Sequence, residues 1–209
     1  MTTSAMMIPL ISFSVRRVRA NAKRKQVTRQ FRCLSYHNVM TTEKKRKKPL
    51  EIPLVGEVDD WENDVIKELL DAKPKRDCVF YIDSMGGSVY GALAITTLIR
   101  QRQLACTGVV LGECSSASLL IFAACQKRLV TRYSTLLFHR MRWQSDKRVG
   151  SREAGLWSKH FEGMEKEIDD LQARLFGAAD AQVREWTEKG EYVTGLQLAE
   201  AGLAELFEL

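Results

Sequence analysis

The sequence predicts an α/β fold built on a mainly parallel sheet. Two continuous apolar runs, residues 78–82 and 104–111, have the pattern of strands buried on both faces. A glycine-containing turn follows each run, and a segment with helical apolar spacing follows each turn. Strands that alternate with helices in this way are joined by parallel crossovers, so an α/β architecture is expected.

The other predicted elements fit this scheme in chain order. Residues 52–58 have the pattern of an opening strand. The apolar residues at 61, 65, 66, 69 and 70 lie on one face of a helix that ends before Pro74. The elements expected after the first glycine turn are a helix over 88–102, the strand over 104–111, a helix over 116–124, strands over 128–132 and 135–139, a long charged helix over 151–176, and a further helix to about residue 188.

Charge divides the chain at about residue 48. Residues 1–48 contain 13 of the 32 Lys and Arg residues but only one of the 26 acidic residues, Glu43. The remaining residues have a net charge of −6, although the whole chain has +6. We therefore predict a basic, disordered extension over 1–48 and one folded domain over 49–209, and we expect no nucleic-acid binding by that domain.

The first 39 residues contain no acidic residue and are rich in Arg, Ser and Thr. Three interpretations are open: an organellar presequence, a basic arm for an acidic partner, or an extension without a fold upstream of a start at Met40. An export signal is not expected, because the positive charges follow the short apolar stretch over 8–15 instead of preceding it.

Cysteine and histidine usage gives no sign of a metal or disulfide framework. The five cysteines form no CxxC pair and there are only three histidines, so we predict no metal site and no cofactor. An odd cysteine count is typical of a reducing compartment, which favours the cytoplasm, or an organellar matrix if residues 1–39 are a presequence. No run of about 18 apolar residues is present, so no membrane-spanning helix is predicted.

Three segments contain candidate catalytic groups, and each also has an ordinary structural explanation. Gly86 and Gly87 follow a buried strand, where glycine serves a tight turn or leaves N–H groups free for an anion. Ser116 stands at the start of an apolar helix, where a serine is a helix cap or a nucleophile beside free helix N–H groups. His139 ends a strand, and it is the best general-base candidate because His37 lies in the basic extension and His160 on the charged helix.

Together these segments resemble the Clp protease proteolytic subunit family, ClpP. The similar segments cover residues 81–95 (an "IDSPGGSV" pattern), 112–124 (the nucleophile segment), 133–139 (an "NSRVMIH" pattern) and 192–203, in the family's order within roughly residues 50–206. The resemblance implies a ClpP/crotonase-like spiral of ββα units with a protruding handle helix, here over 151–176.

The resemblance also implies roles for individual residues. Ser116 matches the nucleophile, His139 the general base, and the N–H groups of Gly87 and Ala117 the oxyanion hole. Gly190 occupies the position of the family's third catalytic residue, an Asp. The adjacent acidic residues Glu188 and Glu191 are therefore the candidates for the carboxylate of the triad.

The expected function is that of a serine endopeptidase in an ATP-dependent Clp-like protease. Its substrates would be unfolded polypeptides delivered by an AAA+ unfoldase, and its subunits would form a homo- or hetero-oligomeric ring, with no nucleic acid and no membrane involved. The segment over 140–150 contains one glycine and no proline where the family has a glycine-rich strand, so ring-to-ring pairing is left open.

Three alternative functions compete with this one. The glycine at position 190 favours a weak or inactive ClpP-like subunit of a mixed oligomer. A crotonase-type acyl-CoA enzyme would use carboxylates and would not need Ser116 and His139. A Ser–Lys signal peptide peptidase would need a membrane-spanning helix. The Ser–His pair favours the peptidase.

Overall fold

A computed structural model describes residues 48–145, 148–177 and 180–209. It confirms the predicted mixed α/β fold with a mostly parallel sheet. The predicted extension over residues 1–48 lies outside the described residues, apart from Lys48. Its boundary with the folded domain therefore stays a prediction.

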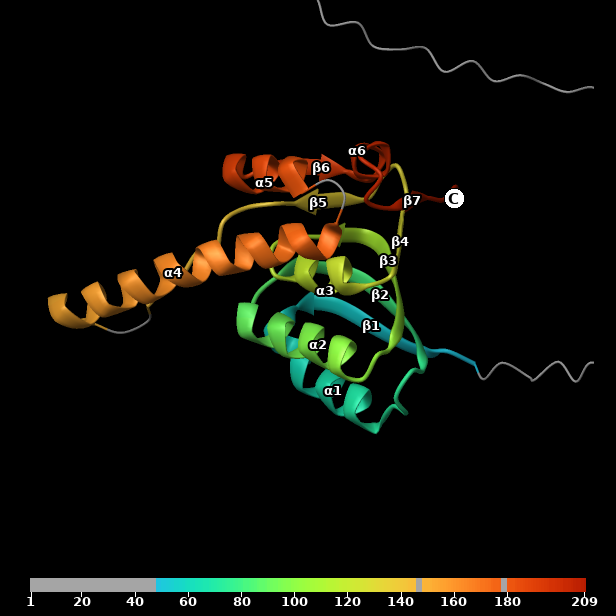
Figure 1. Cartoon of the computed structure of the whole chain (residues 1–209), viewed down its shortest axis with the longest axis horizontal. Coiled ribbons are helices and arrows are strands. Elements are labelled where there is room, and N and C mark those ends of the chain that lie inside the picture. The colour runs from blue at the N-terminus through green and yellow to red at the C-terminus, as the bar shows by residue number, and fades with distance from the viewer. Residues whose placement is uncertain (1–47, 146–147, 178–179) are drawn as a thin grey trace, which may run out of the picture. The chain divides into compact units, whose positions relative to one another are not determined.

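Five parallel strands form the main path of the sheet (Figure 1). Their order follows the chain: β1 (Leu50–Glu57), β2 (Asp77–Gly86), β3 (Ala105–Cys114), β4 (Lys127–Val130) and β7 (Glu205–Leu206). The crossovers between the first four strands are helices α1 (Val58–Asp71), α2 (Val89–Gln101) and α3 (Ser118–Ala124). All seven residues of α3 are buried, as expected for a helix inside the core.

The expectation that the central strands are buried on both faces is wrong for the single chain. Along β2, buried residues such as Phe80 and Ile82 alternate with half-buried or exposed ones such as Tyr81 and Met85. Strand β3 alternates in the same way, with Val110 buried and Leu111 exposed. Side chains of a strand point to opposite faces in turn, so one face packs into the core and the other is only partly covered.

Two short strands extend the sheet beside the end of β3. Strand β5 (Thr135–Leu137) pairs in parallel with β3 at Glu113 and Thr135, and antiparallel with β6 (Tyr192–Thr194). Because β5 starts next to the end of β3, the residues that follow the two strands lie close together.

The handle helix is present where the sequence predicts it, as α4 (Ser151–Phe176). Its buried residues are all near its C-terminal end: Gln172, Ala173 and Phe176. Figure 1 shows its N-terminal half extending beyond the sheet. Helices α5 (Asp180–Lys189) and α6 (Gly195–Glu200) complete the fold. Within the described ranges, no helix has both the length and the apolarity needed to cross a membrane.

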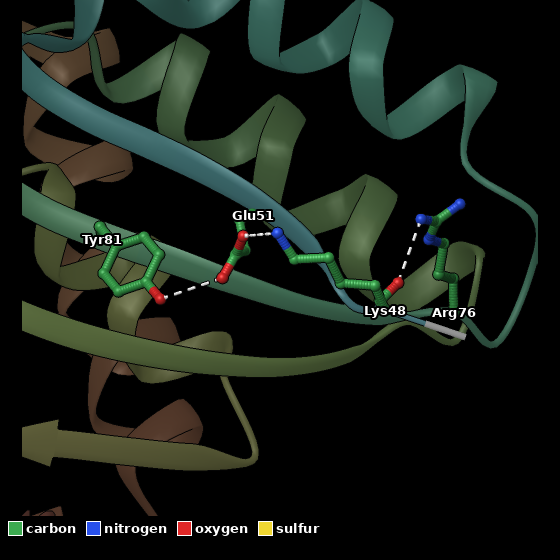
Figure 2. Close-up of polar contacts among 4 residues, drawn as sticks. All are labelled: Lys48, Glu51, Arg76 and Tyr81. Atoms are coloured by element: carbon green, nitrogen blue, oxygen red, sulfur yellow. Dashed lines mark hydrogen bonds and ion pairs between the residues drawn. The ribbon is translucent and has the colours of Figure 1, made fainter. Parts of the chain in front are cut away.

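A polar network links the start of β1 to β2 and to the residue before it (Figure 2). Glu51 forms an ion pair with Lys48 at 2.9 Å and accepts a hydrogen bond from the Tyr81 hydroxyl at 3.4 Å. The Arg76 guanidinium donates to the Lys48 carbonyl oxygen at 3.3 Å. The ion pair lowers the pKa of Glu51, but exposed pairs of this kind add little to stability.

Candidate active site

Ser116 occupies a sharp turn between β3 and α3. Its φ is +56°, in the left-handed region that residues other than glycine seldom adopt. Its backbone N–H donates to the Leu137 carbonyl oxygen at 2.9 Å, which ties the turn to β5. A strained strand-to-helix turn that presents a half-buried serine has the geometry of a nucleophile elbow.

The glycine at position 86 allows the two turns of the site to approach each other. A Cβ atom there would lie 2.6 Å from Ser116 Cβ and 2.8 Å from the Ser115 carbonyl oxygen, closer than such contacts allow. Gly86 and Gly87 both have positive φ, at +104° and +130°. This turn therefore requires glycine for its conformation at both positions, and Gly86 also allows the close approach to Ser116.

Two backbone N–H groups are free beside Ser116. Within the described part of the chain, neither the Gly87 nor the Ala117 N–H donates a hydrogen bond. The position of a Gly86 Cβ would be only 3.1 Å from the Ala117 nitrogen, so Ala117 lies against the same glycine turn. Unpaired donors next to a candidate nucleophile are what an oxyanion hole requires, and these are the two N–H groups that the family resemblance implies.

The ring of His139 is held by its own chain. Its Nδ1 lies 2.6 Å from the Arg140 carbonyl oxygen. A carbonyl oxygen only accepts, so Nδ1 carries the proton in this hydrogen bond. The neutral ring then has a free lone pair on Nε2, which is the form that a general base needs.

One small pocket brings the predicted nucleophile and base together. Ser116, Ala117 and His139 line it, and the other lining residues are Val89, Leu120, Met141, Ile168, Asp169 and Gln172. Its volume of about 20 Å³ is room for about one water molecule.

Of the two predicted triad residues, Glu188 has another partner for its carboxylate, and Glu191 contributes a backbone contact. Glu188 forms an exposed ion pair with the Arg140 guanidinium at 3.8 Å, and the Glu191 carbonyl oxygen accepts from the Phe138 N–H at 3.0 Å. Gly190 has φ +68° and closes the end of α5. Among the described residues, no hydrogen bond or ion pair joins Glu188 or Glu191 to His139.

The acidic residue that does line the pocket, Asp169, was missed by the sequence reasoning. It belongs to the charged helix that the sequence predicts over 151–176, and it lies one helical turn before the buried residues Gln172 and Ala173. That spacing places Asp169 on the inward face of α4, and it is the feature of the sequence that could have indicated this residue. Burial and the neighbouring Glu165 raise the pKa of Asp169 to about 6.

The cysteine beside the turn is not a competing nucleophile. Cys114 is fully buried, and burial raises the pKa of its thiol to about 12, so almost none of it is thiolate near neutral pH. No cluster of three or more His, Cys, Asp or Glu side chains suited to a metal ion occurs among the residues with assigned positions.

Comparison with known proteins agrees with this geometry. The sequence model of the Clp protease family matches residues 38–206, which is most of the chain. The chain belongs to the Clp protease family. The resemblance predicted from the motifs is thereby confirmed, and membership in the Clp protease family supports a peptidase role.

Curated Clp protease subunits are similar at low identity. The ATP-dependent Clp protease proteolytic subunit 1 of Corynebacterium diphtheriae is 29% identical over 155 residues, covering 71% of this chain and 74% of that protein. Proteolytic subunit 3 of Rhodococcus jostii is 27% identical over 162 residues, covering 74% and 78%. Proteolytic subunit 2 of Corynebacterium jeikeium is 28% identical over 148 residues, covering 68% and 70%. The chain is therefore a divergent member of the Clp protease family.

Proposed function

We propose that the protein is a serine endopeptidase, the proteolytic subunit of an ATP-dependent Clp-like protease. The observation that carries the proposal is the shared pocket of Ser116 and His139, with the His139 ring held so that Nε2 is free. A serine hydroxyl is a weak nucleophile until a neighbouring base takes its proton.

In the proposed reaction, Ser116 Oγ attacks the peptide carbonyl carbon while His139 Nε2 takes the hydroxyl proton. The carbonyl π electrons move to the oxygen, which the N–H groups of Gly87 and Ala117 stabilise. The C–N bond then breaks as His139 returns the proton to the leaving amine. Water then attacks the acyl carbon while His139 Nε2 takes one of its protons. The ester C–O bond breaks, His139 returns the proton to Ser116 Oγ, and the acid product leaves.

We also propose that the subunit works in an oligomeric ring and receives unfolded polypeptides from an AAA+ unfoldase, which would hydrolyse the ATP. The partly covered sheet face supports assembly, because Tyr81, Val109 and Leu111 leave apolar surface open in the single chain. The projecting half of α4 adds Leu156, which is also exposed. The names of the curated relatives describe those proteins as ATP-dependent proteolytic subunits.

The test is hydrolysis of an unstructured fluorogenic polypeptide by the full-length protein, with and without its unfoldase. We expect cleavage by the wild type, and loss of cleavage in Ser116→Ala and His139→Ala. His160→Ala is the matched control, because His160 lies outside the pocket on α4 and contacts Tyr90. Equal cleavage by wild type and Ser116→Ala would overturn the proposal, and so would no cleavage by a folded, assembled wild type.

A further inference from the structure

The base of the proposed site has no directly bonded carboxylate in the described structure. His139 donates its Nδ1 proton to the neutral Arg140 carbonyl oxygen. This hydrogen bond selects the correct tautomer, but a neutral acceptor stabilises the imidazolium formed during attack less than a negative charge does. The position that resembles the family's carboxylate is Gly190, which has no side chain.

Helix α4 brings one carboxylate to this pocket. Asp169 lines it together with Ile168 and Gln172, which come from the same stretch of α4. The C-terminal end of α4 is fixed to the strand end that bears the base, because Phe176 packs on Phe138 with ring centroids 5.8 Å apart. Asp169 is therefore held by packed elements and does not depend on an exposed loop.

The groups around Asp169 leave its charge incompletely balanced. Glu165 and Asp170 on α4 are acidic neighbours, and Glu188 on α5 lines the adjoining larger pocket with them. The two nearby arginines have acidic partners other than Asp169: Arg140 pairs with Glu165 at 3.5 Å and with Glu188 at 3.8 Å, and Arg184 pairs with Asp170. A third cation, Lys166, also lines the larger pocket. Among the described residues, no hydrogen bond or ion pair is assigned to Asp169 itself.

We propose that Asp169 is the positioning carboxylate of this site, and that its negative charge stabilises the His139 imidazolium that forms when Ser116 attacks. This inference rests on the proposed function. Asp169 takes up no proton in the reaction: the Ser116 proton passes to His139 Nε2 and then to the leaving amine. The role thus differs from that of a carboxylate bonded directly to Nδ1, because the Arg140 carbonyl holds the ring and Asp169 supplies the charge.

The test is the rate at which a fluorophosphonate modifies Ser116 in the full-length protein, measured by intact mass between pH 5 and 9. Asp169→Asn removes the charge and Asp169→Glu keeps it. Asp170→Asn is the matched control, because Asp170 is the next residue on α4, is paired with Arg184, and does not line the small pocket. Thermal melting monitored by circular dichroism shows that each variant is folded.

We expect Asp169→Asn to react about tenfold more slowly at pH 8. The fall in its rate toward acid pH, the acid limb, should lie about one pH unit lower. Both changes have one cause, because a tenfold less stable imidazolium slows the attack and also makes His139 harder to protonate. Asp169→Glu should keep the acid limb of the wild type, and Asp170→Asn should match the wild type in both readouts. A folded Asp169→Asn with the wild-type rate, or with a lower rate and an unmoved acid limb, would overturn the inference. No modification of the wild type would instead overturn the proposed function, so the two failures are distinguishable.

Discussion

The Arg140 carbonyl oxygen accepts the Nδ1 proton of His139 across 2.6 Å. Two adjacent residues thereby set the tautomer of the imidazole and leave Nε2 without a proton, in a residue that lines the same pocket as Ser116. The acceptor is a backbone atom, so substitution of the exposed Arg140 side chain would leave it in place. This relationship explains how the site can keep an oriented base although position 190 is glycine.

Alanine at position 86 should damage both the fold and the site. Its Cβ would lie 2.6 Å from Ser116 Cβ, at a backbone φ of +104°. We expect Gly86→Ala to lose about 3 kcal/mol of unfolding free energy in urea denaturation, from strain and overpacking together. Gly190→Ala is the control, because its φ is also positive but no atom lies within 4 Å, so it should lose only about 1 kcal/mol. Equal losses would show that the close approach at Gly86 is absent.

Alanine substitutions of the two neighbouring serines, Ser115 and Ser116, should change the unfolding free energy by different amounts. Ser115 is buried and its Oγ accepts the Leu137 N–H at 3.1 Å, so Ser115→Ala leaves a donor unpaired and should cost about 1–3 kcal/mol. Ser116→Ala removes a half-buried hydroxyl with no hydrogen-bond partner among the described residues, and should change stability by less than about 0.5 kcal/mol. Urea denaturation of both variants gives the comparison. A larger loss in Ser116→Ala would assign that hydroxyl a structural role.

The aromatic contact that anchors the base should support both folding and reactivity. Phe138 precedes His139, is fully buried, and lies 5.3 Å from the Trp186 ring, measured between centroids. We expect Phe138→Ala to cost about 3–5 kcal/mol in thermal or urea unfolding and to slow modification of Ser116. Tyr133→Ala, at an exposed position in the loop between β4 and β5, should change neither. A stable Phe138→Ala with normal reactivity would contradict the packing described here.

Ionisation of Asp169 should lower the unfolding free energy at pH values above the pKa of its carboxyl group. Burial raises that pKa from 3.8 to about 6, so the folded state binds the proton more tightly than the unfolded state does. The unfolding free energy therefore falls as pH rises from about 4 to 6, and the penalty is fully present above pH 6. Because solvent screens this half-buried group, we expect Asp169→Asn to be more stable than the wild type by about 1 kcal/mol at pH 8 and by nothing below pH 4.

Asp170→Asn is the control for this pH dependence. A hydrogen bond from Arg184 lowers the pKa of Asp170, so its replacement should have the opposite sign and should not stabilise the protein at pH 8. Urea denaturation at pH 8 and pH 4 measures both variants. Lower stability of Asp169→Asn at pH 8 would show that the carboxylate is well paired in the fold, contrary to the description above.

Much of the fold follows from local pattern. Helix α4 begins and ends at the predicted residues of the long charged segment, 151–176. The buried run before Gly86 gives β2, although the strand continues to Gly86 itself. The prediction of strands buried on both faces did not hold for the single chain, since apolar residues on an outward face have the same pattern whether the core or another subunit covers them.

The candidate site was predictable only in part. Ser116, His139, Gly87 and Ala117 stand in motifs, so sequence alone points to them, and their roles stay predictions. The hydrogen bond from His139 to Arg140 and the place of Asp169 in the pocket depend on how β5 and α4 pack, which no local pattern specifies. Glu188 was close in sequence to the expected carboxylate position, yet its side chain pairs with Arg140 at the surface.

The most direct test of the central claim is the intact mass of the full-length protein after incubation with a fluorophosphonate. Ser116→Ala is treated in parallel, and His139→Ala tests whether the base activates the serine. We predict a single adduct on the wild type, no adduct on Ser116→Ala, and a strongly slowed reaction in His139→Ala. An unmodified wild type in a folded, assembled sample would contradict an activated Ser116, and so would an adduct that persists in Ser116→Ala.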